Sequence, residues 1–271
     1  MGAVQRLYAD GPFGQIHGRL AKPDREGAKP PLVCLHQSPK SGLEFEAFMR
    51  VASVDRILVA PDYPGYGMSD APPSESEATI PAYAKSAWAL ADALDLGRVD
   101  LFGNHTGSKV AAEMAVQRPG DVRAIAMVSA AILTDEERAQ FDGYFQPVPL
   151  DRDGTRFKTM WERIVHHAGP GMTLEMMAVS MRQNMMGGEA YEWGHAAAFA
   201  WGPPFEAALA ELPHPITILN PGDELQEATR RAAPLMKAGE IIELPDWGHG
   251  FLDVQAEDAA RLVTGRLDAA G

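Results

Sequence analysis

The stretch Gly103-Asn104-His105-Thr106-Gly107 joins an apolar segment to an Ala-rich one, and this junction decides how the rest of the sequence is interpreted. Residues 99–102 have the composition of a short buried strand, and residues 108–117 have the pattern of a helix. A Gly-x-His-x-Gly turn between a strand and a helix pushes its central side chain outward, because only small flanking residues allow so sharp a turn. We therefore expect His105 to project into a cleft at the carboxyl end of a sheet.

Strand and helix patterns alternate on both sides of this junction. Residues 15–20 alternate between apolar and polar as an early antiparallel strand does. The other predicted elements are strands at residues 31–36, 56–61, 99–102, 122–129, 216–219 and 240–244, and helices at residues 42–51, 80–96, 108–117 and 257–267. This alternation predicts an α/β fold with a mostly parallel central sheet that carries helices on both faces.

Residues 133–212 differ from the rest of the chain. Strand patterns are absent there, and methionine and aromatic residues are dense. We expect a helical cap at residues 133–212, inserted into a core that residues 1–132 and 213–271 form. Because flexible methionine side chains adapt to varied apolar ligands, the underside of such a cap suits a small molecule of apolar character.

Three further segments carry recognisable turns. Leu35-His36-Gln37-Ser38-Pro39 follows an early strand and is similar to a His-Gly-x-Pro loop, with Gln37 in place of the glycine. Residues 62–69 read Asp-Tyr-Pro-Gly-Tyr-Gly-Met-Ser, and residues 247–252 read Trp-Gly-His-Gly-Phe-Leu. Together with the turn at His105, these segments resemble the α/β-hydrolase fold superfamily, in the order along the chain that this fold has.

The resemblance implies a role for several residues. His105 stands where the family usually has a Ser, Asp or Cys nucleophile, and His249 stands where it has the catalytic histidine. The acid is expected after the strand at residues 216–219, where alignment favours Glu224, with Asp223 immediately before it as a rival. The backbone N–H groups of Ser38 and Thr106 would form the oxyanion hole.

We also expect the substrate to be contacted by residues that flank these turns or lie in the cap. The residues predicted to contact it are His36, Gln37, Trp193, His195 and Trp247.

A histidine at the elbow allows more than one chemistry. His105 could attack a carbonyl carbon directly, with His249 and Glu224 handling the proton. The two histidines could instead deprotonate a water together, or remove a proton from the substrate in a lyase, isomerase or cofactor-free oxygenase. Loss of the usual nucleophile is also typical of a non-hydrolytic ligand-binding protein. A metal held by two histidines and a carboxylate has no other support in the sequence.

These patterns together favour a hydrolase that acts on an ester, a lactone or a related carbonyl compound of apolar character, with no cofactor. The chain has 24 Lys and Arg against 37 Asp and Glu, a net charge of −13, which argues against nucleic-acid and membrane partners. The lone Cys34 can form no internal disulfide. Residues 1–6 lack the pattern of a signal peptide, so we expect a cytoplasmic protein with a small-molecule substrate, and a homodimer is left open.

Overall fold

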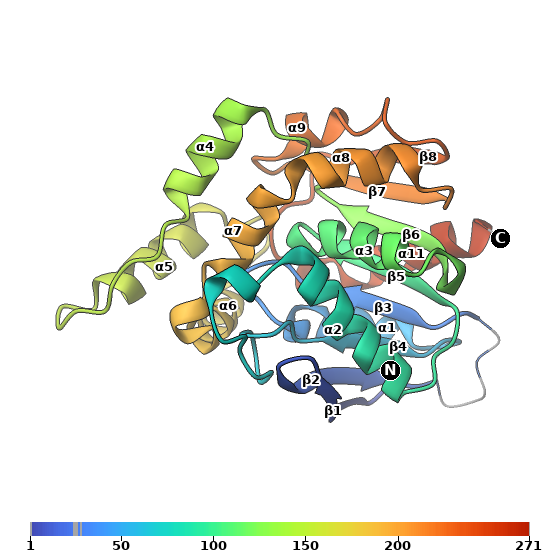
Figure 1. Cartoon of the computed structure of the whole chain (residues 1–271), viewed down its shortest axis with the longest axis horizontal. Helices are drawn as coiled ribbons and strands as arrows, with labels where there is room; N and C mark the ends of the chain where they lie inside the picture. The colour runs from blue at the N-terminus through green and yellow to red at the C-terminus, as the bar shows by residue number, and fades with distance from the viewer. Residues whose placement is uncertain (1, 24–26, 28, 271) are drawn as a thin grey trace.

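The computed structural model describes residues 2–23, 27 and 29–270, and its centre is an eight-stranded sheet (Figure 1). The strands are β1 (Val4–Gly11), β2 (Gly14–Ala21), β3 (Leu32–Leu35), β4 (Leu58–Pro61), β5 (Val99–Asn104), β6 (Val122–Val128), β7 (Ile216–Pro221) and β8 (Gly239–Leu244). They lie in the order β1-β2-β4-β3-β5-β6-β7-β8. Strand β2 pairs antiparallel with β1 and β4, and the remaining pairs are parallel. The predicted α/β class with a mostly parallel sheet is confirmed.

Helices cover both faces of this sheet, and each face buries its own apolar layer. The helices are α1 (Glu46–Ala52), α2 (Ile80–Ala93), α3 (Thr106–Gln117), α4 (Asp135–Tyr144), α5 (Thr155–His166), α6 (Leu174–Met186), α7 (Trp193–Ala200), α8 (Gly202–Glu211), α9 (Gln226–Arg230), α10 (Phe251–Val254) and α11 (Ala256–Ala269). Helices α2, α3, α7 and α8 pack in one layer, and α1, α10 and α11 pack in the other. Strands β3 to β6 are therefore buried on both sides, which accounts for their continuous apolar runs.

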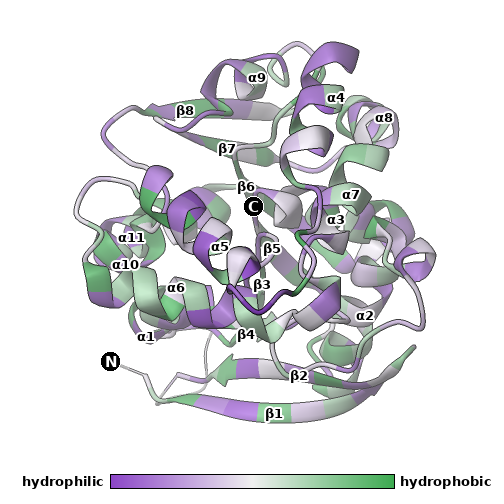
Figure 2. Cartoon of the chain, turned by 90° about the vertical axis from the view of Figure 1, so that its left-hand side faces the viewer, coloured by the Kyte–Doolittle hydropathy of each residue, from purple (hydrophilic) through white to green (hydrophobic). Residues whose placement is uncertain are grey.

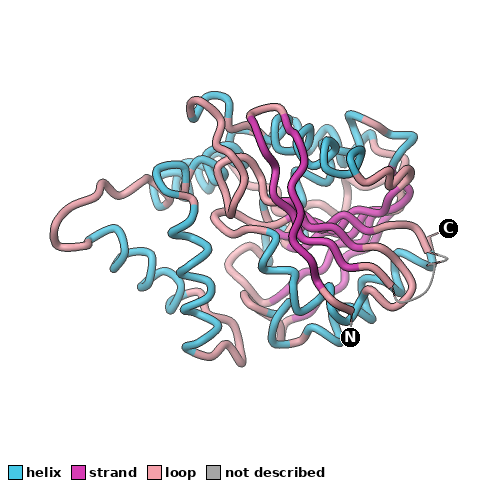
Figure 3. The backbone as a smooth tube through the Cα atoms, turned by 90° about the horizontal axis from the view of Figure 1, so that it is seen from below, coloured by secondary structure: helices cyan, strands magenta, loops and turns pink. Residues whose placement is uncertain are grey.

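The helices between β6 and β7 fall into two groups. Helices α4, α5 and α6 extend away from the carboxyl ends of the strands, as Figure 3 shows from below, and α5 and α6 cross in front of those ends in Figure 2. Helix α8 instead packs on α3, and its Phe205 and Leu209 are fully buried in the core. The helical segment predicted at residues 133–212 thus supplies both a projecting part and a part of the core layer.

The bounds of the elements that were predicted individually agree with the structure to within a few residues, and β1, α9 and α10 were not predicted. Strand β1 is a half-exposed edge strand, and such a strand shows no strong alternation of apolar residues. Helices α9 and α10 are too short for a clear helical period. A short 3₁₀ turn, η1 (Gly42–Phe45), precedes α1 and begins the helix predicted from residue 42. Within the described residues, no helix has the length and apolar character needed to cross a membrane.

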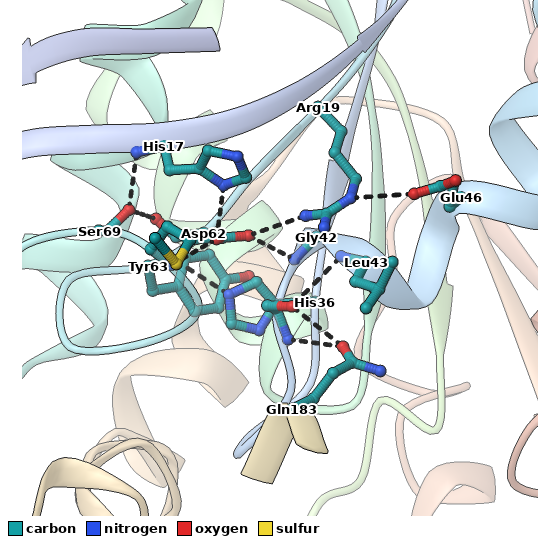
Figure 4. A network of polar contacts seen from close by, with 12 residues as sticks. His17, Arg19, His36, Gly42, Leu43, Glu46, Asp62, Tyr63, Ser69 and Gln183 are labelled. Carbon is teal, nitrogen blue, oxygen red and sulfur yellow. Dashed lines mark hydrogen bonds and ion pairs between the residues drawn. The ribbon is translucent and has the colours of Figure 1, made fainter. Parts of the chain in front are cut away.

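A buried carboxylate, that of Asp62, ties the loop after β4 to the loop after β3 (Figure 4). Its Oδ2 lies 2.7 Å from His17 Nδ1 and accepts the backbone N–H of Met68 at 2.9 Å. Its Oδ1 accepts the N–H of Gly42 at 2.8 Å. Burial opposes ionisation of Asp62, but the hydrogen bond and the charge of His17 outweigh it and hold its pKa below the usual range. The two loops that border the sheet's carboxyl edge are thus joined through one side chain.

Replacing Asp62 with asparagine should reduce the free energy of unfolding by about 3 kcal/mol or more at pH 7, because an amide N–H₂ then faces backbone N–H donors. Since the pKa of Asp62 is lower in the folded chain than in the unfolded one, its stabilisation is present above about pH 4 and is lost as the pH falls through the folded value. Urea denaturation at pH 7 and at about pH 2.5 tests this, because the difference between the wild type and the variant should shrink only below about pH 4. The exposed Asp246→Asn is the control. Equal stability of the two variants at pH 7 would contradict the prediction.

Candidate active site

His105 occupies a strained turn between β5 and α3. Its backbone has φ 49° and ψ −108°, a region that residues with side chains rarely adopt. The turn is held by hydrogen bonds on both sides, because the N–H of His105 donates to Val128 O at 3.0 Å and its own carbonyl accepts the N–H of Ser108 at 2.9 Å. The predicted elbow is therefore formed, with His105 at its tip.

The two glycines of the turn are required by space. A Cβ added to Gly103 would lie 2.2 Å from the carbonyl oxygen of Gly107, and a Cβ added to Gly107 would lie 1.9 Å from that of Leu35. Both distances are far below van der Waals contact, so β5, α3 and the end of β3 approach one another as closely as backbone allows.

The imidazole rings of His105 and His249 lie face to face, with centroids 4.9 Å apart and planes 25° from parallel. Each ring has a carboxylate of its own from the loop after β7. His105 Nε2 lies 3.4 Å from Asp223 Oδ2, and His249 Nε2 lies 3.1 Å from Glu224 Oε2. The sequence treated Asp223 and Glu224 as rivals for one position, whereas the structure places each against a different histidine.

Further side chains hold the two carboxylates. Asp223 Oδ2 accepts the hydroxyl of Ser129 at 2.6 Å, and Oδ1 accepts the N–H of Leu225 at 2.8 Å. Ser129 follows β6 and has a φ of 49°, so its hydroxyl is presented by a second strained position at the sheet edge. Nδ1 of His167, which follows α5, lies 3.5 Å from Glu224 Oε2. The site is thus formed by residues at the edge of the core sheet, such as Ser129, and of the projecting helices, such as His167.

Opposite charges at short range set the ionisation of this cluster. Burial opposes ionisation of both carboxyls, but His105 and Ser129 lower the pKa of Asp223, and His167 and His249 hold the pKa of Glu224 far below its usual value. Burial likewise opposes protonation of His249, yet the hydrogen bond and charge of Glu224 raise its pKa. A histidine with a raised pKa is a stronger base when neutral.

The two predicted oxyanion donors lie side by side. Ser38 and Thr106 both line the cavity at His105, and the N–H of Ser38 donates a long hydrogen bond of 3.4 Å to the hydroxyl oxygen of Thr106. Thr106 is the first residue of α3, so its N–H lies at the end of the helix that favours negative charge.

The cavity has a volume of about 220 Å³ and lies between the carboxyl edge of the sheet and the projecting helices. Gln37 and His195, for which the sequence predicted a substrate contact, line it. The apolar part of its wall is formed by Leu133, Phe141, Phe145, Met160, Ile164, Met172, Met176, Val179, Phe199 and Phe251.

Three predicted substrate contacts do not face this cavity. His36 is fully buried, and its ring nitrogens are used by the N–H of Tyr63 at 2.9 Å and the carbonyl of Gln37 at 2.8 Å. Trp193 packs on the apolar layer that contains α2 and α3, and Trp247 stacks on Phe251 in the opposite layer. The predictions for His36, Trp193 and Trp247 are corrected accordingly, because closeness in sequence to a functional turn does not decide on which side of the backbone a ring packs.

The sequence analysis missed several charged residues of the cavity wall, among them Lys40 and Glu44. Lys40 donates from its Nζ to Asn184 Oδ1 at 2.7 Å and also contacts Ser180, both on α6, and burial lowers its pKa to about 8. Glu44 lies in η1 with only 8% of its surface exposed. The departure at Gln37 was the available signal for Glu44, because a side chain in place of glycine needs a polar neighbour.

The same side chains have the composition of a metal site. Donor atoms of His105, Asp223 and His249 lie within 4.8 Å of one another, as do those of His167, Glu224 and His249. Two imidazoles with a carboxylate are a ligand set that zinc or iron accepts. An experiment on the site therefore needs an arm in which divalent metals are removed.

In this α/β protein, one cleft at the carboxyl edge of the mostly parallel sheet brings together the elbow, the loop of His249 after the last strand and the loop of Asp223 and Glu224 after β7. The family model for the alpha/beta hydrolase fold matches residues 30–202, and the chain belongs to this family.

Known proteins similar to this chain include several hydrolases. A proline iminopeptidase of Heyndrickxia coagulans is 24% identical over 147 residues, which cover 54% of this chain and 51% of that protein. The structure of an esterase from Thermogutta terrifontis has a TM-score of 0.78 at 20% identity, over 98% of this chain and 99% of the other. A meta-cleavage product hydrolase from Pseudomonas fluorescens has a TM-score of 0.78 at 15% identity, with 98% of each chain covered. The chain spans about half or less of the length of the curated relatives it matches.

Replacing Gly107 with alanine should destabilise the fold by about 3 kcal/mol, because the new Cβ meets the fixed carbonyl of Leu35. Gly265→Ala is the matched control. Gly265 lies inside α11 with no atom within 4 Å of an added Cβ, so alanine there should stabilise the protein by about 0.5 to 1 kcal/mol. Urea denaturation of both variants should therefore give changes of opposite sign, and a Gly107→Ala protein as stable as the wild type would show that the turn can relax.

Proposed function

We propose that the chain hydrolyses an ester, a lactone or a related carbonyl compound of apolar character, with His105, His249, Glu224 and Asp223 as its catalytic residues. The observation that carries the proposal is the pair of stacked imidazoles, each against its own carboxylate, at the tip of the elbow. The apolar wall of the cavity suits an apolar small-molecule substrate, and the esterase among the similar structures supports an ester as the substrate class.

The contacts of the Nε2 atoms of the two histidines favour water, rather than an imidazole nitrogen, as the group that attacks the carbonyl carbon. Nε2 of His105 and Nε2 of His249 both face carboxylates. A nitrogen that donates its proton to a carboxylate has no lone pair for attack on carbon, whereas Nδ1 of the same ring then carries one and can take a proton from water. A covalent acyl-imidazole at His105 Nε2 would first require that nitrogen to leave Asp223.

The proposed reaction begins when one imidazole takes a proton from a water as its oxygen attacks the carbonyl carbon. The tetrahedral oxyanion accepts hydrogen bonds from the N–H groups of Ser38 and Thr106. Collapse of this intermediate breaks the bond to the leaving oxygen, which takes the proton back from the imidazolium. The products are an acid and an alcohol, and the neutral histidine is restored.

Replacing either His105 or His249 with alanine should lower kcat/KM for an activated aryl ester by about 100-fold or more, because each removes a base from the water. His166→Ala is the control, since His166 is adjacent in sequence to His167 but does not line the cavity. Activity is measured with and without exhaustive chelation of divalent metals, and hydrolysis that survives chelation supports the two histidines as the bases.

Rapid acid quench with intact-mass analysis separates the mechanisms. The proposal predicts no acyl adduct during turnover and one ¹⁸O atom from labelled water in the acid product. An acyl group on His105 would overturn the water mechanism in favour of a covalent one. If no ester or lactone is turned over while an apolar ligand binds tightly, the chain is a binding protein on a hydrolase scaffold. Removal of a substrate proton without hydrolysis would indicate a lyase or a cofactor-free oxygenase.

A further inference from the structure

Glu44 is a buried acid at the cavity that the proposed reaction does not use. It lies in η1, and its carboxylate faces the loop after β3 and the residue before the elbow histidine. Oε1 accepts the N–H of Gln37 at 2.8 Å and the side-chain amide of Asn104 at 3.4 Å. Oε2 accepts the side-chain amide of Gln37 at 3.0 Å. Three N–H donors, two from the loop after β3 and one from the end of β5, therefore converge on one carboxylate.

Both partners of Glu44 adjoin residues with a proposed role in the reaction. Gln37 immediately precedes Ser38, and Asn104 immediately precedes His105. Glu44 binds the N–H of Gln37 and so fixes the peptide unit before Gln37, while the next unit, which carries the Ser38 N–H, is held through the carbonyl of Gln37 by the N–H of Lys40 at 2.9 Å. Glu44 also accounts for the unusual Gln37, since its carboxylate receives the amide that a glycine would lack.

We propose that Glu44 is a positioning residue, which in its ionised form holds the Gln37-Ser38 loop and the His105 turn in the arrangement that catalysis needs. This inference rests on the proposed hydrolytic function of the same site. Glu44 itself touches no reacting atom in the proposed reaction. It acts through Gln37, which precedes Ser38, and through Asn104, which precedes His105.

The surroundings of Glu44 make this arrangement sensitive to pH. Burial raises its pKa to about 7, although its hydrogen bonds and the nearby Lys40 lower it. The other titratable groups that face it are Cys34 and Tyr63, whose pKa values burial and the charge of Glu44 raise well above the usual range. Cys34 and Tyr63 therefore stay neutral near pH 7. Below that pH a proton on Glu44 turns one acceptor oxygen into an O–H donor, so the N–H group that faces this oxygen loses its hydrogen bond.

Glu44→Gln mimics the protonated side chain and is the test. Above pH 8 its kcat on an aryl ester should be about 10-fold lower than that of the wild type, with KM changed less than about twofold, because a charge-assisted hydrogen bond is lost without a substrate contact. The ratio of wild-type to variant kcat should fall towards 1 below pH 6, where the wild type is itself protonated. A ratio independent of pH, or equal kcat at pH 8, would overturn the proposal.

Two further variants separate positioning from general damage. Glu257→Gln makes the same change of charge on the exposed face of α11 and should follow the wild type at every pH. Gln37→Ala removes the Oε2 hydrogen bond and a side chain of the cavity wall but leaves both Oε1 hydrogen bonds. Its kcat should therefore fall less than that of Glu44→Gln and keep its dependence on pH near 7, while KM reports any lost cavity contact. Loss of that dependence in Gln37→Ala would contradict the role of the Glu44 charge, even if Glu44→Gln does not fold.

A readout without substrate distinguishes failure of this inference from failure of the proposed function. Hydrogen exchange of the segment at residues 35–43, corrected for intrinsic rates, should be slow in the wild type above pH 7 and faster below it. In Glu44→Gln it should be fast throughout. If the exchange follows this pattern but no ester is hydrolysed, the positioning stands and the function fails. If exchange is the same in both proteins, the positioning is wrong whatever the activity.

Discussion

The site depends on one place where three backbone segments touch with no room for a side chain. The carbonyl of Gly107 lies against Gly103, and the carbonyl of Leu35 lies against Gly107, so β3, β5 and α3 are locked together at their ends. This contact compels the positive φ of His105 and directs the start of α3 at the loop that contains Ser38. The strain at His105 is sustained because hydrogen bonds to β6 and within α3 fix the residues on either side.

Near this contact lie two separate histidine–carboxylate pairs, rather than one chain of hydrogen bonds through a single carboxylate. Asp223 serves His105 and Glu224 serves His249, and the two carboxylates are neighbours on one loop. The arrangement follows from the histidine at the elbow. Its imidazole is long enough to reach Asp223 in the loop after β7, whereas a serine side chain at this position would be too short. Ser129 and His167 then complete the neighbourhood from β6 and from the end of α5.

The sequence was sufficient for what depends on backbone. Glycine spacing, apolar runs and proline boundaries located the elbow, the sheet and the loop of His249, because steric limits on φ and on close approach leave few alternatives. It was insufficient for what depends on which way a side chain packs. Trp193 and Trp247 are close in sequence to His195 and His249, yet their side chains pack in the apolar layers of the core. Both ring nitrogens of His36 form hydrogen bonds with backbone groups. Glu44 was missed for the same reason, since Gln37 marks an unusual loop but the sequence does not show which polar side chain lies against it.

Helix α6 contacts both the wall of the cavity and the residues that follow the loop of Ser38. Lys40 and Ser41, which directly follow the oxyanion loop, bind Asn184 and Gln183 on this helix, and the same helix contributes Met176 and Val179 to the cavity wall. A change in α6 that alters the cavity wall therefore also acts on the loop for which we propose a role in stabilising negative charge. The same helix contacts thus affect both the shape of the cavity and the loop beside His105. If the helices of this region were exchanged for those of another family member during evolution, residues 40 and 41 would be expected to change with them.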